Sequence, residues 1–385
     1  MNKRKVCVVI TARPSYSRIK TALIAINNHP KLELQLVLAG SSLLDRYGSV
    51  LKVIESDGFV ITDKIYNVIE GESPSSMAKT TGLGIMELST TFENIKPDVV
   101  VTIADRFETI ATSIAASYQN IPLAHIQGGE VTGNIDEKVR HANTKLADIH
   151  LVATSEAHER VLRLGEYPEN ITTTGCPSMD IAKIVLEEPD LDFNPMTKYG
   201  GVGADIKWES GYIVVMQHPV TNESEKSREH IESTIEAIKQ LDLQTFWFWP
   251  NVDAGSDGTA KGMRAFRENH ELNNVHFFKN MTPVDFLRLV KNSMCLVGNS
   301  SVGIRECAFL GVPVVNIGTR QNRRQKSKNV IECDYNIASI SDAINKQVSR
   351  SHYEPDYIYG DGTAGQEIAD VLATCELRFH KTITY

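Results

Sequence analysis

The sequence lacks the features that mark several large protein classes. It has only six cysteines, with no Cys-x-x-Cys pair and no close Cys/His group, at positions 7, 176, 295, 307, 333 and 375. A zinc site or a disulfide framework needs tighter spacing, so we expect reduced, mostly buried thiols and no metal. No apolar run approaches the ~18 residues of a membrane span, and the run at residues 6–10 is too short for a signal peptide.

Positive charge is also scarce. Forty Lys and Arg residues stand against 48 Asp and Glu residues, which gives a formal net charge of −8. This balance argues against a nucleic-acid partner, although a local arginine cluster could still bind a phosphorylated small molecule. With 42% hydrophobic and 23% charged residues, the composition is that of an ordinary globular protein, and we expect a cytoplasmic one.

The chain alternates short apolar runs with helical patterns, which predicts βαβ units and open parallel sheets. In the first half, the helical stripe Ile19, Ala22, Leu23 and Ile26 follows the first apolar run. Predicted strands lie at residues 6–10, 32–38, 99–103, 121–126 and 149–153, and then at 212–216, 245–249, 275–278, 295–297 and 312–317. We therefore predict an α/β fold of two doubly wound, Rossmann-like domains with a cleft between them.

The rhythm breaks once, at residues 186–211, where two prolines and the Gly200–Gly203 cluster indicate a linker or long loop. The Gly-x-Gly here follows no predicted strand, so a nucleotide-binding loop is the weaker interpretation. We assign residues 1–185 to an N-terminal domain and 212–365 to a C-terminal domain. We expect residues 366–385 to form a helix that packs back toward the N-terminal domain.

Polar residues collect where the predicted strands end, which is where open α/β sheets bind ligands. Any one of these turns is unremarkable, but the set on two sheets indicates a site between the domains. The segments are Arg13-Pro-Ser15, Asp105-Arg106, Gln127-Gly-Gly-Glu130, Gln217-His218-Pro219, Pro250-Asn251, Gly298-Asn-Ser-Ser-Val-Gly303 and Gly318-Thr-Arg320.

The turn at residues 298–303 is the most informative of these segments. Small hydroxyl residues at a strand-to-helix junction place backbone N–H groups and serine hydroxyls where a phosphate could bind. The simpler alternative is ordinary N-capping by Asn299 or Ser300. Glu306, about one turn further along, would suit ribose hydroxyls. Guanidinium groups suited to a diphosphate come from Arg13, Arg106 and Arg320.

The densest group of acids and bases lies at residues 127–141. Asp136 with Arg140, and Glu137 with His141, have i,i+4 spacing, so both pairs could be surface ion pairs on a helix. Together with Asp105 and His218, they could instead surround a neutral sugar ring and perform acid–base chemistry. No Gly-x-Ser-x-Gly, Walker or His-Glu-x-x-His motif is present, so serine hydrolase, P-loop and zincin activities lose their main support.

Taken together, these motifs resemble those of the hydrolysing UDP-N-acetylglucosamine 2-epimerases, in the same order along residues 5 to 375. They comprise Ala104-Asp-Arg-Phe107, His125-Ile-Gln-Gly-Gly-Glu-Val-Thr-Gly-Asn-Ile-Asp136, Arg140-His141, Gln217-His-Pro-Val-Thr221, Pro250-Asn-Val-Asp-Ala-Gly255, Gly298-Asn-Ser-Ser301, Gly318-Thr-Arg320 and Ile358-Tyr-Gly-Asp-Gly362. The resemblance implies the two-domain GT-B architecture. It also implies elimination of UDP through a 2-acetamidoglucal, followed by hydration to free N-acetylmannosamine for sialic-acid biosynthesis.

The resemblance further implies partners and roles. The substrate would be a UDP-sugar and UDP a product, with no cofactor and no metal, in a homodimer or homotetramer. Asp105, Asp136 and Glu137 would carry the acid–base chemistry, with Arg140 as their partner and Glu130 a weaker candidate. The expected nucleotide-sugar contacts are Arg13, Ser17, Arg106, His218, Asn251, Ser300, Ser301, Glu306 and Arg320.

Two positions depart from the family pattern. Gln127 stands where many members have Glu, and an amide cannot take up a proton at neutral pH; Ser42 stands where several have His. Three alternatives therefore remain open. They are the same reaction on UDP- or GDP-linked diacetylbacillosamine for legionaminic-acid biosynthesis, a GT-B glycosyltransferase, and a non-catalytic nucleotide-sugar binder.

Overall fold

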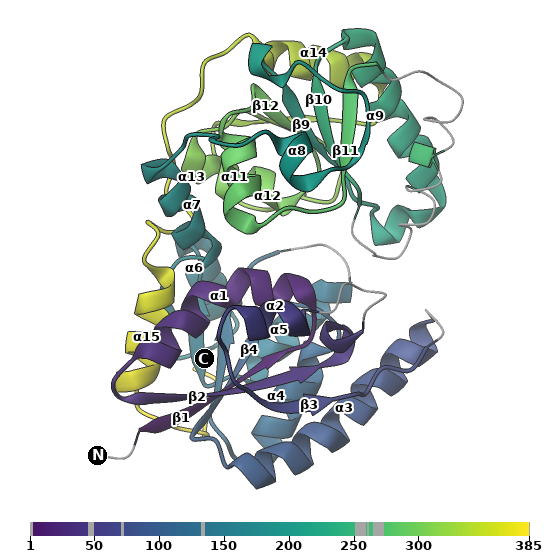
Figure 1. The fold of residues 1–385 in the computed structure, drawn as a ribbon. Helices are drawn as coiled ribbons and strands as arrows, with labels where there is room; N and C mark the ends of the chain where they lie inside the picture. The colour runs from purple at the N-terminus through teal and green to yellow at the C-terminus, as the bar shows by residue number, and fades with distance from the viewer. Residues whose placement is uncertain are drawn as a thin grey trace. The chain divides into compact units, whose positions relative to one another are not determined.

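The chain forms two compact units in a computed structural model (Figure 1). Unit 1 comprises Met1–Asp180 and Tyr359–Tyr385, and unit 2 comprises Ile181–Ile358. The structure describes residues 3–44, 50–70, 73–131, 135–250, 259, 262–264 and 273–384. The division falls inside one helix, α7 (Ser178–Glu187), because the chain passes into unit 2 without an intervening loop.

Unit 1 is built on a seven-stranded parallel sheet with the order β3-β2-β1-β4-β5-β6-β7. Its strands are β1 (Arg4–Ile10), β2 (Leu32–Ala39), β3 (Ile61–Ile65), β4 (Val99–Ile103), β5 (Leu123–Ile126), β6 (Ile149–Val152) and β7 (Ile171–Thr173). The strand order reverses between β1 and β4. In a doubly wound sheet this reversal is the switch point, beyond whose strand ends ligands bind.

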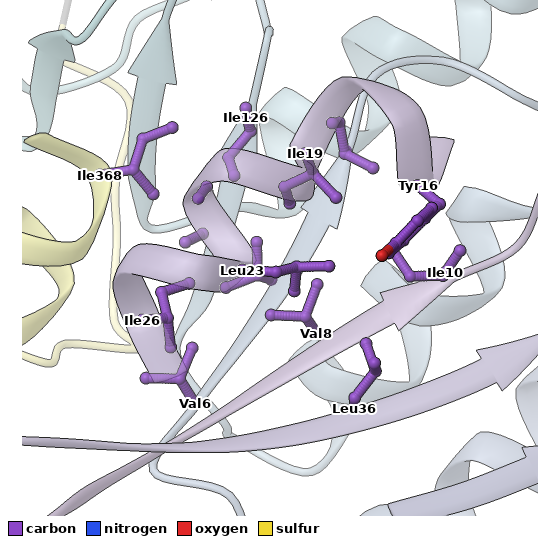
Figure 2. Close-up of a cluster of buried hydrophobic side chains, with 14 of the residues drawn as sticks. Val6, Val8, Ile10, Tyr16, Ile19, Leu23, Ile26, Leu36, Ile126 and Ile368 are labelled. Atoms are coloured by element: carbon purple, nitrogen blue, oxygen red, sulfur yellow. The ribbon is translucent and has the colours of Figure 1, made fainter. Parts of the chain in front are cut away.

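Alternating side chains of β1 pack against helices on both faces of this sheet. Val6, Val8 and Ile10 share a buried cluster with α1 (Arg13–Asn28), whose inner stripe includes Leu23 (Figure 2). Cys7 and its neighbours pack instead against α3 (Pro74–Ile95) and α4 (Thr109–Tyr118). Each aliphatic side chain buried in this way contributes about 1.5–3 kcal/mol. The helical stripe predicted at residues 19–26 is therefore confirmed.

The chain returns to unit 1 at its C-terminal end. Helix α15 (Ala364–Thr374) lies beside α1 and adds Ile368 and Leu372 to the same buried cluster (Figure 1). Both carboxylate oxygens of Asp180 accept backbone N–H groups from the first turn of α15, at 2.9 Å from Ala364 and 2.7 Å from Gly365. A carboxylate at the N-terminus of a helix also interacts favourably with the helix dipole.

Unit 2 repeats the same winding. Its sheet has the order β14-β13-β12-β9-β10-β11-β8, with the switch point between β9 and β12. The strands are β8 (Val202–Gly203), β9 (Ile213–Met216), β10 (Thr245–Phe248), β11 (Val275–Phe278), β12 (Cys295–Gly298), β13 (Val314–Ile317) and β14 (Val330–Cys333). Ile213, Val215 and Trp247 pack against α9 (Ser227–Leu241) and α14 (Ile337–Val348).

The remaining elements connect these layers. They are η1 (Gly40–Leu43), α2 (Leu51–Ser56), α5 (Ile135–Leu146), α6 (Ser155–Arg163), η3 (Pro168–Asn170), α8 (Pro195–Tyr199), η4 (Trp208–Ser210), η5 (Thr221–Lys226), α11 (Pro283–Lys291), α12 (Ser301–Ile304) and α13 (Glu306–Leu310). Thr282 caps α11 through Asp285 N, with proline at the first helical position as the sequence predicts.

The segment expected to be a linker needs correction. Residues 186–211 lie within unit 2, where they form α8, β8 and η4. Strand β8 pairs antiparallel with β11 at the edge of the sheet. The glycine-rich sequence does not have the apolar pattern of a strand. Glycine is required because the backbone approaches β11 closely: a Cβ on Gly203 would lie 2.4 Å from the carbonyl oxygen of Val275.

Two doubly wound α/β sheets are confirmed. Of the six cysteines, four are buried and two are half-buried. In the described parts of the chain, no helix is both long and apolar enough to cross a membrane.

Candidate functional site

A buried ion pair occupies the switch point of unit 1. Asp105 follows β4 and is 7% exposed, and Arg140 on α5 is fully buried. Arg140 donates through Nη2 to the Asp105 carboxylate and through Nη1, at 2.7 Å, to the carbonyl oxygen of Gln127. One guanidinium thus joins the ends of β4 and β5. Removing either member of such a pair leaves an uncompensated buried charge.

The chain bends sharply at both of these strand ends. Ala104 and Gln127 have φ angles of +61° and +63°, in the left-handed region that non-glycine residues rarely adopt. Each such residue costs of order 1–3 kcal/mol and persists only where its surroundings hold it. The strain lies directly beside Asp105, which indicates that this turn is built to aim the carboxylate.

His125 holds the Ala104 turn from below. Its Nε2 lies 2.9 Å from the Ala104 carbonyl oxygen and its Nδ1 3.1 Å from the Thr144 hydroxyl. Complete burial lowers the pKa of His125 to about 3, so the ring is neutral at physiological pH. A carbonyl can only accept, so Nε2 must carry the single proton and donate it to Ala104. A Cβ on Gly128 would lie 2.9 Å from both His125 and Thr144, which explains the glycine there.

Gln127 lies inside the site but has an unexpected partner. Its side chain is completely buried, and Nε2 donates to Cys176 Sγ at 3.0 Å. The Cys176 sulfur in turn lies 3.0 Å from Ser178 Oγ. Glu130, three residues along the same turn, is 5% exposed. Gln127 is therefore a buried neutral group, and the buried carboxylates on the turns after β4 and β5 are those of Asp105 and Glu130.

The two i,i+4 pairs predicted on α5 differ in the structure: one is a surface pair, and the arginine of the other points into the unit. Glu137 and His141 do form a half-exposed pair, with 3.2 Å between Oε1 and Nε2. Arg140 points into the unit toward Asp105 and belongs to the core. Asp136 is half-buried on the same turn. Surface pairing thus explains one of the two spacings and leaves the other to the site.

The remaining candidates of unit 1 lie near the same edge. Arg13 begins α1, and exposed Ser17 donates to the Arg13 carbonyl at 3.4 Å. Arg106 Nε lies 3.3 Å from Glu108 Oε2, and Glu108 is only 3% exposed. This buried carboxylate, which was not predicted as a site residue, orients the Arg106 side chain.

In unit 2, amide and backbone groups join the ends of β9 and β12, the two strands of its switch point. Asn299 follows β12 and His218 follows β9, and they bond reciprocally: His218 N donates to Asn299 Oδ1 at 2.7 Å, and Asn299 Nδ2 donates to the His218 carbonyl at 2.8 Å. Gly298 makes this possible, because with φ at +133° a Cβ there would lie 2.2 Å from the Met216 carbonyl oxygen. Both predicted strand ends are therefore locked together by amide and backbone groups.

Around this lock stand the residues expected to bind a nucleotide. Ser300 caps α12 by accepting from Val302 N at 3.4 Å, which is the simpler of the two roles considered for it. Arg320 Nη1 donates to the Asn299 carbonyl at 3.2 Å. Glu306 begins α13, and its Oε2 is a buried atom with no hydrogen-bond partner among the described residues.

Two separate groups of predicted residues are thus brought together. Unit 1 joins Asp105, Gln127 and Arg140, and unit 2 joins His218 and Arg320 through Asn299. Ser301 is half-buried at the start of α12. Asn251 lies outside the described residues. Within those residues, no cluster of three or more His, Cys, Asp or Glu side chains has the geometry of a metal site.

The supporting residues His125, Thr144 and Asn299 were not given site roles from the sequence. One signal was present: a histidine inside a fully buried strand must find hydrogen-bond partners, and its position next to a strand end points at the adjacent turn.

Comparison with known proteins gives concordant matches. The family model for UDP-N-acetylglucosamine 2-epimerase matches residues 24–373. The chain is 31% identical over 375 residues to the "UDP-N,N'-diacetylbacillosamine 2-epimerase (hydrolyzing)" of Legionella pneumophila, covering 97% of each chain. It is also 31% identical over 374 residues to a UDP-N-acetylglucosamine 2-epimerase of Neisseria meningitidis serogroup B, covering 96% of this chain and 95% of the relative.

Among solved structures, the fold is similar to that of UDP-GlcNAc 2-epimerase from Neisseria meningitidis bound to UDP-GlcNAc. The TM-score is 0.79 at 18% identity, covering 96% of this chain and 99% of the other.

Proposed function

Because the chain belongs to the UDP-N-acetylglucosamine 2-epimerase family and is a hydrolysing nucleotide-sugar 2-epimerase, we propose that its substrate is UDP-N-acetylglucosamine and its products are N-acetylmannosamine and UDP. The observation that carries the proposal is the buried Asp105–Arg140 pair at the unit 1 switch point. It provides an oriented carboxylate beside strained backbone, where acid–base chemistry needs one.

The reaction divides into two balanced steps. A carboxylate takes the proton from C2 of the sugar while the bond from C1 to the UDP oxygen breaks, which leaves a C1=C2 double bond and UDP. Water then adds its hydroxyl to C1, and a proton returns to C2 from the opposite face. Because the two proton transfers occur on opposite faces, the reaction uses two acid–base groups. The two steps together involve no net oxidation or reduction.

We assign these proton transfers to Asp105 and to the Asp136/Glu137 pair. Arg140 donates to the Asp105 carboxylate and holds it in place at the end of β4. Gln127 cannot exchange a proton at neutral pH, and its amide is engaged with Cys176. Glu130, buried on the same turn, is the substitute if the α5 acids do not reach the sugar.

Most of the residues that we assign to nucleotide binding lie in unit 2. Asn299 accepts hydrogen bonds from the His218 backbone and the Arg320 side chain, which holds both residues at the strand ends. The side chains of His218 and Arg320 suit a diphosphate. Ser300 and Ser301 would add hydroxyl contacts to the diphosphate, and the unpartnered buried oxygen of Glu306 would accept from ribose hydroxyls. Arg13, Ser17, Arg106 and Asn251 complete the proposed set.

A second substrate, UDP-N,N'-diacetylbacillosamine, is favoured by one specific observation. The Legionella relative named for that sugar and the Neisseria relative named for UDP-N-acetylglucosamine are both 31% identical to this chain. The two sugars differ at C4 and C6, away from the C1 and C2 chemistry, so the same acid–base groups would serve either.

We further propose that the enzyme acts in the cytoplasm as a homodimer or homotetramer. Light scattering of the purified chain at several concentrations would show a mass of two or four chains, and a single-chain mass at all concentrations would contradict this.

The test is to incubate the protein with each UDP-sugar in deuterated water and to analyse the products by NMR. We expect free UDP and free N-acetylmannosamine carrying deuterium at C2 from UDP-N-acetylglucosamine. Deuterated product that remains UDP-linked would contradict the hydrolytic reaction. Turnover of the diacetylbacillosamine donor alone would transfer the assignment to that sugar. Binding of both donors without turnover would contradict catalysis.

A further inference from the structure

The C-terminal strap, residues 376–384, lies beyond the part of the chain that the family model matches. We propose that this strap positions Asp105 for turnover, with Lys381 as the positioning residue that acts through α5. The inference rests on the proposed function, because it concerns the rate of the reaction assigned to Asp105.

Lys381 is attached to the C-terminal end of α5. Its Nζ donates to the carbonyl oxygen of Ala147 at 2.6 Å and to that of Thr144 at 3.4 Å. The last carbonyls of a helix have no partner within the helix and carry partial negative charge, so an ammonium group there satisfies and stabilises them. The Lys381 side chain is only 21% exposed, so its ammonium group is largely shielded from solvent at this contact.

The same ammonium group completes a charge cluster under α5. Glu166 is 3% exposed and accepts from Lys381 at 2.6 Å, from Lys145 at 2.5 Å and from His150 Nε2 at 3.0 Å. Burial alone would raise the pKa of Glu166, but these hydrogen bonds outweigh it and lower the pKa to about 2. The carboxylate is therefore ionised at neutral pH, and losing Lys381 would remove one of its compensating charges.

Two further contacts hold the strap in place. Thr382 Oγ1 lies 2.6 Å from the hydroxyl of Tyr167, the residue after Glu166. Leu377 packs against the buried cluster that α1 and α15 share. The strap is thus fixed at its beginning by apolar packing and at Lys381 and Thr382 by polar contacts.

Two series of contacts connect the end of α5 that Lys381 binds to Asp105. Arg140 lies one turn before Thr144 and donates directly to the Asp105 carboxylate. The Thr144 hydroxyl contacts His125, which holds the carbonyl of Ala104, the residue before Asp105. A small displacement of the end of α5 would therefore move both the partner of the carboxylate and the turn that carries it. A 1 Å misplacement of a reacting group can cost about a hundredfold in rate.

The test compares three substitutions on the full-length protein. Lys381→Met should lower kcat about tenfold, while KM and the Kd for UDP stay within about twofold of wild type, because only the reacting group is displaced. Lys381→Arg keeps the cation and should recover kcat to within about threefold. Arg378→Met is the matched control: Arg378 is an exposed strap cation that pairs with Glu376, two residues away, and should leave kcat unchanged.

All three variants are assayed well below their melting temperatures, so that a purely structural effect, which lowers the folded fraction, leaves kcat per folded molecule unchanged. Wild-type kcat in Lys381→Met, or an equal loss in Arg378→Met, would overturn the proposal. If Lys381→Met does not fold, Tyr167→Phe decides, with a two- to threefold lower kcat expected and wild-type kcat contradicting it. A wild-type chain that does not turn over a UDP-sugar would instead refute the proposed function.

Discussion

Six strands of each sheet follow the same order, but the contacts that join the strand ends at or beside the switch points differ. In unit 1 the ends of β4 and β5 are joined by a buried guanidinium, which pairs with the Asp105 carboxylate. In unit 2 the ends of β9 and β12 are joined by the Asn299 amide and the His218 backbone. The common topology decides where a ligand binds, and the side chains at the strand ends decide whether the place suits proton transfer or binding.

The difference has an energetic side. A buried ion pair pays a large desolvation cost that only complete pairing offsets, so it holds a carboxylate rigidly and fails badly when broken. Hydrogen bonds between neutral amide groups contribute about 1 kcal/mol each and are less costly to lose. In unit 1, the carboxylate that we propose for proton transfer is therefore also part of a contact that stabilises the fold. In unit 2, the contact that joins the strand ends contains no carboxylate.

Loss of the Arg140 guanidinium in unit 1 should change the stability most. Arg140→Met should lower the free energy of unfolding by about 3–5 kcal/mol, because Asp105 loses the Arg140 guanidinium and remains buried. Asn299→Ala should cost about 1–3 kcal/mol. Urea unfolding followed by circular dichroism measures both.

Asp105→Asn combined with Arg140→Met serves as the control. Removing both charges should recover part of the loss, since the cost comes from the charge left unpaired. Equal destabilisation by Arg140→Met and Asn299→Ala, or no recovery in the double variant, would show that the two switch points do not differ in this way.

A smaller effect should appear in the pH dependence of stability. The pKa of His125 is lowered by burial from 6.5 to about 3 in the folded state, so the unfolded chain binds the extra proton between these values. This contribution to stability is present above about pH 6.5 and is lost as the pH falls toward 3. His125→Gln should therefore flatten the decline between pH 6.5 and 5, by up to about 1.4 kcal/mol per pH unit.

The free energy of unfolding of both proteins at several pH values gives the two slopes. Other buried histidines keep their own contributions in both proteins, so the difference isolates His125. Equal slopes would mean that His125 is not held neutral and does not hold the Ala104 turn by donating from Nε2.

Much of this arrangement could be predicted from the sequence. Continuous apolar runs and helical apolar stripes indicate both sheets. Strands buried on both faces give the first pattern and helices buried on one face give the second, as at Val6–Ile10 and Ile19–Ile26. The edge strand β8 could not be found in this way, since Val202 and Gly203 bury little and only their pairing with β11 defines them.

The sequence predicts that the site lies at the strand ends, but it does not predict which side chains contact one another there. Helical spacing pairs Arg140 with Asp136, whereas Arg140 also reaches Asp105, which is 35 residues away in the chain. Such a contact depends on how α5 packs on the sheet. The strap contact between Lys381 and Glu166 spans 215 residues and leaves no local pattern at all.

We propose that unit 1 performs the chemistry and that unit 2 supplies most of the nucleotide contacts. This claim can be tested by measuring kcat and the Kd for UDP together in Asp105→Asn and Asn299→Ala. We predict that Asp105→Asn lowers kcat about 10²–10⁴-fold with UDP affinity within about twofold of wild type, whereas Asn299→Ala weakens UDP roughly tenfold with little change in kcat at saturation. Wild-type turnover in Asp105→Asn, or equal loss of UDP affinity in both variants, would contradict the claim.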